Sequence, residues 1–289
     1  MAVARHVHGP IDLHAHSSVS DGTETPAELV RAAAAAGLDT IALTDHDSTA
    51  GWSEASAAAI VEHVTLIPGM EFSTRVEYAS VHLLAYLFDP ADSALLAEMT
   101  LVRAARLTRA EQMVARIGAD YDLSWEDVLA QTTPEATVGR PHIADALVAR
   151  GHALNRSAAF AGILHWKAGY YQPHYAPDPL RAIQLVRAAG GVPVIAHPAT
   201  RGIGDIVAES RLKTLVEAGL FGLELGHREN KPEPTARLYE LAAKFGLFVT
   251  GSSDYHGTGK PNRLGENTTA PEVLERIIAE GRGSAPIYG

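Results

Sequence analysis

Short apolar runs alternate with longer stretches of mixed polarity along most of the chain, which predicts strands followed by helices. Several of these runs are continuously apolar, as expected for strands that are covered on both faces. Alternation at this spacing predicts a parallel sheet, and seven strands are enough to close a barrel. The predicted strands are Pro10–His14, Thr40–Thr44, Val64–Ile67, Val81–Leu87, Val192–Ala196, Gly222–Leu225 and Phe248–Gly251.

The stretches between these strands carry signals for helix starts and ends. Thr25-Pro26-Ala27-Glu28 has the pattern of a capping box with proline at the first helical position, and Gly37 predicts the end of that helix. The other predicted helices of the alternating part are Ala50–Glu62, Pro179–Ala189, Gly204–Ala218, Glu233–Phe245 and Pro271–Glu280.

Between about Asp92 and Tyr175 the alternation stops and the pattern predicts helices only. We therefore expect a barrel made of residues 1–91 and 176–289, with a helical insertion or cap formed by residues 92–175. The predicted helices of the insertion are Ser93–Ile117, Ser124–Gln131, Arg140–Arg150 and Arg156–Trp166.

The composition excludes several kinds of chemistry. The 289 residues include no cysteine, which excludes disulfides, thiolate zinc sites and cysteine nucleophiles and fits a reducing cytosol. The chain has neither an apolar run near the ~20 residues that cross a bilayer nor a signal peptide, so we expect a soluble cytoplasmic protein with no membrane partner. A net charge of −10 argues against an extended nucleic-acid surface, but a small anion could bind if metal ions supply positive charge.

Histidines and carboxylates gather near the ends of the predicted strands. His14 and His16 lie two residues apart at the end of the first strand, so their side chains share a face and can hold one metal ion. His82 comes near the start of its predicted strand, and we expect that boundary to be shifted. The candidate metal ligands are His14, His16, Asp21, His46, Glu71, His82, His197, Asp254 and His256.

Each candidate ligand has an ordinary interpretation when taken alone. A single His46 or His197 is more often a hydrogen-bonded core histidine, Glu71 could cap a helix, and Asp254 could belong to a turn. Together they would meet at the mouth of the barrel formed by the strand carboxyl ends, where this architecture places its active sites. Such a group is costly to bury without partners, and metal binding explains the whole set.

Motifs of several residues follow one another along nearly the whole barrel: Asp12-Leu13-His14-Ala15-His16-Ser17, Ser20-Asp21-Gly22, Leu43-Thr44-Asp45-His46-Asp47, Gly69-Met70-Glu71, Ala196-His197-Pro198 and Ser253-Asp254-Tyr255-His256-Gly257. In these motifs the chain resembles the PHP (polymerase and histidinol phosphatase) family. In the insertion, Gly139-Arg140-Pro141-His142-Ile143-Ala144 resembles the stand-alone bacterial branch, which includes nucleoside 3′,5′-bisphosphate phosphatases and enzymes that trim short RNA from the 5′ end.

The resemblance implies an α/β fold, a distorted (β/α)7 barrel with an inserted helical cap domain, that holds two to three divalent ions. The first ion would take His14, His16, Glu71 and Asp254; the second would share Glu71 and add His82 and His197; the third would take Asp21, His46 and His256. Two positions depart from the family pattern. Some relatives have histidine in place of Asp21, and Arg201 stands further beyond His197-Pro198 than the arginine of relatives does.

Mixed imidazole and carboxylate ligands favour Mn²⁺, Fe²⁺ or Zn²⁺ over Mg²⁺ or Ca²⁺. The expected reaction is hydrolysis of a phosphate monoester by a hydroxide that bridges two ions, with Arg140 stabilising the developing charge. Asp45 is expected to orient a ligand histidine. The expected substrate is a small phosphorylated compound, either a nucleotide such as a nucleoside 3′,5′-bisphosphate or a short RNA end. Further residues expected to line the pocket are His142, Lys167, His174, Arg201 and His227.

Two other functions are compatible with parts of this pattern. A metal-dependent amidohydrolase also begins with two histidines spaced in this way and ends with a strand aspartate, but no lysine stands near the end of a middle strand to form the usual carbamate bridge. A noncatalytic metal-binding PHP module is the second alternative. The complete ligand set and the absence of an attached polymerase argue against it.

Overall fold

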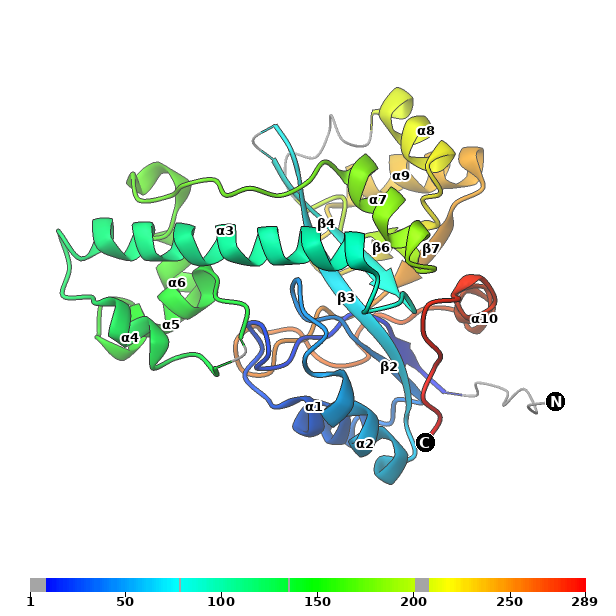
Figure 1. The fold of residues 1–289 in the computed structure, drawn as a ribbon, viewed down its shortest axis with the longest axis horizontal. Coiled ribbons are helices and arrows are strands. Elements are labelled where there is room, and N and C mark those ends of the chain that lie inside the picture. Colours follow the sequence, from blue (N-terminus) through cyan, green and yellow to red (C-terminus); the bar gives the residue numbers. More distant parts are fainter. Residues whose placement is uncertain (1–8, 78, 135, 201–207) are drawn as a thin grey trace.

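The computed structural model describes residues 9–77, 79–134, 136–200 and 208–289. Seven strands form one sheet in which each strand pairs with its neighbour in sequence, and the sheet curves into a nearly closed barrel (Figure 1). The strands are β1 (Ile11–Asp12), β2 (Thr40–Leu43), β3 (Thr65–Val76), β4 (Ala79–Tyr86), β5 (Val192–Ile195), β6 (Gly222–Gly226) and β7 (Phe248–Gly251). The α/β barrel expected from the sequence is therefore confirmed.

The first and last strands approach each other just beyond their carboxyl ends. Ala15 forms an isolated parallel bridge with Tyr255, and the His16 N–H donates to the Tyr255 carbonyl at 2.8 Å. The buried Asp12 carboxylate also accepts a hydrogen bond from the Ser253 N–H at 3.0 Å. These contacts place the motifs that follow β1 and β7 side by side, although 241 residues separate Asp12 from Ser253 in sequence.

The expectation of an entirely parallel sheet is wrong for one strand. β4 runs antiparallel to both β3 and β5, whereas the other neighbouring pairs are parallel. Only residues 77 and 78 separate β3 from β4, and so short a connection permits an antiparallel hairpin but no parallel crossover. The start of β4, with His82, consequently lies at the same mouth as the carboxyl ends of the parallel strands. The strand begins at Ala79, two residues before the predicted Val81, and its direction accounts for the position of His82.

The helices of the barrel follow the predicted signals. The capping box between Thr25 and Glu28 is present, with the Glu28 N–H donating to the Thr25 hydroxyl and the Thr25 N–H donating to the Glu28 carboxylate. Residues 204–207 of the predicted helix Gly204–Ala218 lie outside the described part of the chain. The barrel helices are α1 (Pro26–Ala35), α2 (Trp52–Glu62), α7 (Pro179–Ala188), α8 (Glu209–Glu217), α9 (Pro232–Phe245) and α10 (Pro271–Glu280).

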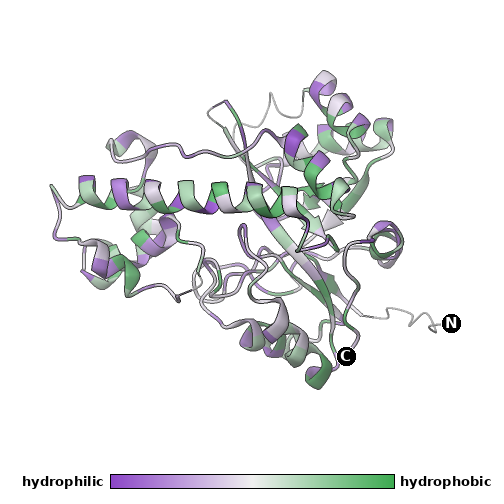
Figure 2. Cartoon of the chain, viewed as in Figure 1, coloured by the Kyte–Doolittle hydropathy of each residue, from purple (hydrophilic) through white to green (hydrophobic). Residues whose placement is uncertain are grey.

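The helices between β4 and α7 extend to one side of the barrel (Figure 1). The longest, α3, alternates hydrophobic and hydrophilic positions along its length (Figure 2). Its first half buries Leu95, Met99 and Val102 in the barrel core, while its second half buries Met113 and Ile117 in a separate cluster with the other helices. α3 thus ties the helical layer to the barrel. The helices are α3 (Ser93–Ile117), α4 (Trp125–Leu129), α5 (Arg140–Ala149), α6 (Arg156–Ala161) and the short 3₁₀ helix η1 (Trp166–Ala168).

Tyr86 links the barrel core to the first histidine motif. Its side chain is fully buried, and its hydroxyl donates to the Leu13 carbonyl at 2.9 Å, one residue before His14.

Among the described residues, no helix combines the length and apolar character needed to span a membrane.

Candidate metal centre

Every candidate ligand except Asp21 lies within a strand or at most five residues beyond the end of one. His14 and His16 follow β1 and are fully buried, with their Nε2 atoms 3.1 Å apart. Asp254 and His256 follow β7, and His46 follows β2. Glu71 lies within β3, which is longer than predicted, and its N–H donates to the Thr44 carbonyl at 3.0 Å where β2 ends.

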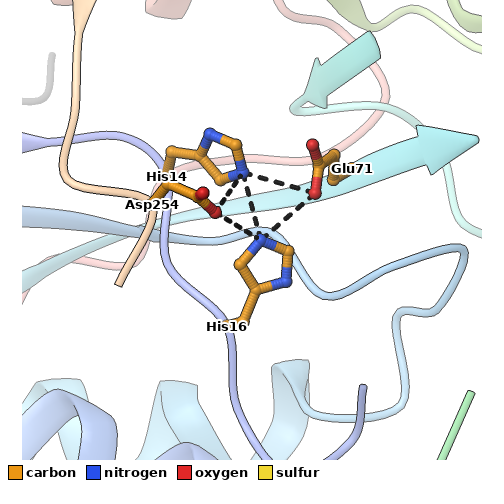
Figure 3. A group of neighbouring side chains, drawn as sticks. All are labelled: His14, His16, Glu71 and Asp254. Carbon is orange, nitrogen blue, oxygen red and sulfur yellow. Dashed lines mark hydrogen bonds and ion pairs between the residues drawn. The ribbon is translucent and has the colours of Figure 1, made fainter. Parts of the chain in front are cut away.

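One group contains His14, His16, Glu71 and Asp254 (Figure 3). The histidine Nε2 atoms lie 3.2–3.4 Å from Glu71 Oε2 and 3.3–3.4 Å from Asp254 Oδ1. Four atoms that surround one ion tetrahedrally at about 2.1 Å stand roughly 3.4 Å apart. The spacing of these two nitrogens and two oxygens therefore fits a divalent transition-metal ion.

Glu71 also faces a second group of histidines through its other oxygen. Glu71 Oε1 lies 2.7 Å from His82 Nδ1 and 3.0 Å from His197 Nε2. One carboxylate thus stands between two sets of imidazoles, one on each oxygen. The family resemblance implied that two ions share Glu71, and this sharing stays a prediction.

The position of His46 differs from that implied division. Its Nδ1 lies 3.2 Å from Glu71 Oε2, and its Nε2 lies 3.7 Å from Asp21 Oδ2, so its ring stands between two groups. By distance alone, His46 belongs with Glu71 and His82, and Asp21 belongs with His16 and His256. An imidazole has two nitrogens that can bind metal, so the assignment of His46 to the third ion stays a prediction.

The charges and the unpaired atoms of the cluster also favour bound cations. Burial acts to lower the pKa of His16, but Asp254 and Glu71 outweigh it and raise that pKa to about 9. The cluster therefore stabilises added positive charge. His46 Nδ1 and His256 Nε2 are buried and make no hydrogen bond, although each lies 3.2 Å from a carboxylate oxygen. Buried polar atoms without hydrogen bonds are costly, and a metal ion between each nitrogen and its carboxylate would satisfy both.

Two ligand positions require an unusual backbone. His197 and Asp254 have φ angles of 31° and 54°, in the left-handed region that residues other than glycine rarely adopt. Such conformations persist where the surrounding structure holds them, and they gather at functional sites. The strain here turns both side chains into the cluster, where Asp254 meets His14 and His16, and His197 meets Glu71.

Glu224 is a site residue that the sequence reading missed. It is fully buried in β6, its Oε1 lies 3.0 Å from His14 Nδ1, and its Oε2 accepts from the His197 N–H at 2.9 Å. A carboxylate on the far nitrogen of a ligand histidine fixes the ring and its tautomer. The signal that could have found it is a glutamate inside the apolar strand Gly222–Leu225.

Lys260 is a second site residue that the sequence analysis did not identify. Its Nζ donates to Asp254 Oδ2 at 2.7 Å, on the side of that carboxylate away from His14 and His16, and about a third of its side chain is exposed. Burial acts to lower the pKa of Lys260, but Asp254 and Asp21 raise it above its ordinary value, so the amine stays charged. No local motif marks this lysine, because its position depends on the turn after Asp254.

Asp45, predicted to orient a ligand histidine, contacts that histidine only through a serine. Its Oδ1 accepts from the Ser20 hydroxyl at 2.6 Å, and the Ser20 oxygen lies 3.3 Å from His16 Nδ1. Asp45 also accepts from the Ser17 N–H and hydroxyl at 2.8 and 2.6 Å. The carboxylate therefore holds the loop that carries His16 and Asp21.

The predicted pocket residues fall into different environments. The guanidinium of Arg140 stands over the rings of Phe160 and Tyr171, 5.3 Å from each centroid. His142 Nδ1 accepts from the Gly139 N–H at 3.1 Å, which caps α5 and gives this buried histidine a structural role. His227 Nε2 lies 3.4 Å from Asp254 Oδ2, beside the metal cluster.

Of the three other predicted pocket residues, His174 accepts from Arg109 Nη1 at 3.0 Å through its Nδ1. Lys167 lies on η1 with its Nζ 5.1 Å from the Trp166 ring centroid, and none of its described contacts involves a candidate metal ligand. Arg201 lies outside the described residues.

Comparison with known proteins identifies relatives over nearly the whole chain. The family model of the PHP domain matches residues 12–118. A 3′,5′-nucleoside bisphosphate phosphatase of Chromobacterium violaceum is 32% identical over 93% of this chain and 95% of its own length. A 5′-3′ exoribonuclease of Haemophilus influenzae is 32% identical over 92% of this chain and 96% of its own.

Solved structures share the fold at similar coverage. A Bifidobacterium adolescentis structure named as a metal-dependent phosphoesterase superposes with a TM-score of 0.91 at 43% identity, over 95% of this chain and 98% of that one. A Chromobacterium violaceum structure named as an amidohydrolase, with bound sulfate and no metal, has a TM-score of 0.84 at 31% identity, over 94% of this chain and 96% of that one. The fold, the grouped ligands and these relatives together show that the chain belongs to the PHP family.

Proposed function

We propose that this chain hydrolyses phosphate monoesters of small nucleotides, such as nucleoside 3′,5′-bisphosphates or short RNA ends, with two to three divalent transition-metal ions. The observation that carries the proposal is the pair of histidine groups on the two oxygens of Glu71. The relatives named as a bisphosphate phosphatase and an exoribonuclease support the nucleotide class.

The metal ligands would be the nine residues predicted from the sequence, with Glu71 shared between two ions. Three divalent ions carry a charge of +6, and the carboxylates of Asp21, Glu71 and Asp254 carry −3, which leaves about +3 with neutral histidines. This local excess of positive charge at the metal centre explains how a protein with a net charge of −10 can attract phosphate. When bound, such ions lower the pKa of a coordinated water to ~7 and neutralise the phosphoryl oxygens.

The chain's own residues would keep the ligands in place and bind the substrate. Glu224 holds His14 and the backbone of His197, and Lys260 holds Asp254 from the outer side. Asp45 fixes the loop of His16 through Ser17 and Ser20. Residues 92–175 would form a cap domain whose Arg140, flanked by two aromatic rings, contributes a positive charge for the substrate.

A metal-dependent amidohydrolase remains the second candidate, because a structural relative is named as one. The described residues near the ends of β3, β4 and β5 include no lysine that could form a carbamate bridge between ions. Lys260 follows β7 and pairs with Asp254. Aryl phosphates compared with matched amides and carboxylic esters would separate the two functions.

The first prediction concerns metal content. The purified protein, reconstituted with manganese, should carry two to three ions per chain, since the ligand atoms form three groups that share Glu71 and His16. Activity should disappear on treatment with a chelator and return when manganese is restored. Elemental analysis that finds less than one ion per chain would exclude the proposed centre.

The second prediction separates the cap from the metal centre. Arg140→Ala should leave the metal content unchanged, because Arg140 lies on α5 and not among the ligands. It should lower kcat/KM by roughly 30-fold, about 2 kcal/mol, because a charge-assisted contact with the substrate is lost. An unchanged kcat/KM would remove the substrate role of Arg140.

The third prediction concerns the substrate. Adenosine 3′,5′-bisphosphate should be hydrolysed with a kcat/KM well above that of a simple aryl phosphate, because binding energy from the remote group acts at the reacting centre. Steady-state assays of both compounds at equal metal loading provide the comparison. Equal efficiency would count against the nucleotide assignment and leave the phosphoesterase proposal intact.

A further inference from the structure

A second group of positive charges lies where α3 meets β3, apart from the predicted ligands. Arg106 and Arg109 of α3 are both buried, with only 6% and 7% of their surfaces exposed. Arg106 is neutralised in part, because its Nη1 donates to Asp47 Oδ2 at 3.0 Å and to the Ser73 hydroxyl at 2.7 Å. A buried arginine normally has a carboxylate partner of this kind.

Arg109 has no such partner among the described residues. Its Nη1 donates to the imidazole Nδ1 of His174 at 3.0 Å, and no carboxylate of the described chain forms an ion pair with it. Burial, followed by the charges of Arg106 and Arg140, lowers the pKa of Arg109 to about 9. The guanidinium therefore still carries its charge at neutral pH, at a site that lacks a compensating anion.

His174 is a neutral hydrogen-bond donor in this group. Burial, followed by the charges of Arg109 and Arg106, lowers the pKa of His174 to about 2, and the candidate metal ligand His82 also contributes to this shift. The ring is neutral, and Nδ1 accepts from Arg109, so the proton must lie on Nε2. The contact of Arg106 with Asp47, the residue after His46, places the group beside the candidate metal centre.

Three buried N–H groups of this cluster have no acceptor. They are Arg106 Nε, Arg109 Nε and His174 Nε2, each inaccessible to solvent and without a hydrogen-bond partner in the structure. Unpaired buried donors are costly, and three in one cationic group call for an acceptor that the chain does not supply. An anion within reach of Arg109 and His174 would satisfy two of these donors and balance the charge.

The structure also contains a cavity at this place. A hollow of about 340 Å³ lies between α3 and the segment 173–175, and Arg109 and His174 both line it. Thr108 and Gln112 add polar groups to the same wall. The volume is sufficient for a phosphate group, and the lining offers donors and a positive charge but no carboxylate.

We propose that Arg109 and His174 bind a phosphate group of the nucleotide substrate other than the phosphate that is hydrolysed at the metal centre. The proposal rests on the proposed function and names the residues that would bind the second phosphate of the substrate. Arg109 supplies the charge, and His174 fixes one guanidinium nitrogen while presenting its own Nε2 proton.

Kinetics of the manganese-loaded enzyme test this role. Wild type and Arg109→Met are compared on two substrates. The first is adenosine 3′,5′-bisphosphate. The second is the adenosine monophosphate that keeps the phosphate hydrolysed by the enzyme and lacks the other phosphate. The variant should lose at least about tenfold in kcat/KM on the bisphosphate and less than about twofold on the monophosphate. Lys213→Met, at an exposed lysine of α8 that among the described residues pairs only with Glu217 of the same helix, is the control and should behave as wild type on both.

Thermal unfolding gives a second readout that does not depend on turnover. Because Arg109 carries an uncompensated buried charge, Arg109→Met without ligand should be as stable as wild type or more stable. Inorganic phosphate should raise the Tm of the wild-type holoenzyme more than that of the variant.

The outcomes distinguish the possible failures. Equal losses on both compounds, or a variant that is destabilised without ligand, would make Arg109 a structural residue and overturn the proposal. A phosphate effect on Tm with no selective kinetic loss would assign the site to free phosphate, which also overturns it. If wild type hydrolyses aryl phosphates but neither nucleotide, the proposed nucleotide function fails, and the phosphate-dependent Tm shift still tests the anion site itself.

Discussion

The buried carboxylate of Glu71 is the point on which the metal centre depends. One of its oxygens lies within 3.2–3.4 Å of His14, His16 and His46, and the other lies within 2.7–3.0 Å of His82 and His197. An isolated carboxylate at this depth would be strongly disfavoured, and imidazoles alone compensate it only if they are protonated. Divalent ions would balance the charge without that requirement. The barrel therefore assembles ligands from β1, β2, β4, β5 and β7 around one residue of β3.

Local patterns in the sequence were sufficient to predict most of the fold. The seven apolar runs, the Thr25 capping box and the loss of alternation after Asp92 are short-range signals, and the structure has strands or helices at each. The direction of β4 was missed because strand direction depends on the connection rather than on the apolar run. That error explains why His82 seemed misplaced, since an antiparallel strand begins at the mouth where its parallel neighbours end.

The candidate ligands were predictable because they stand next to strands in short motifs, whereas their supporting residues were not. Glu224 reaches His14 across 210 positions of sequence, and Arg109 reaches His174 across 65. Such contacts arise from packing between distant elements, for which a single sequence contains no local pattern. A charged residue within an apolar run, as with Glu224, is the one signal that was available. Arg109 offered none, because it lies on a helix with several arginines.

Anomalous diffraction from crystals of the manganese-loaded protein tests the central claim most directly. Two peaks should flank the Glu71 carboxylate, one among His14, His16 and Asp254 and the other beside His82 and His197. Ligand distances should be about 2.0–2.3 Å, as expected for nitrogen and oxygen ligands of a transition metal. A single peak, or manganese that leaves Glu71 without a metal contact, would contradict the account.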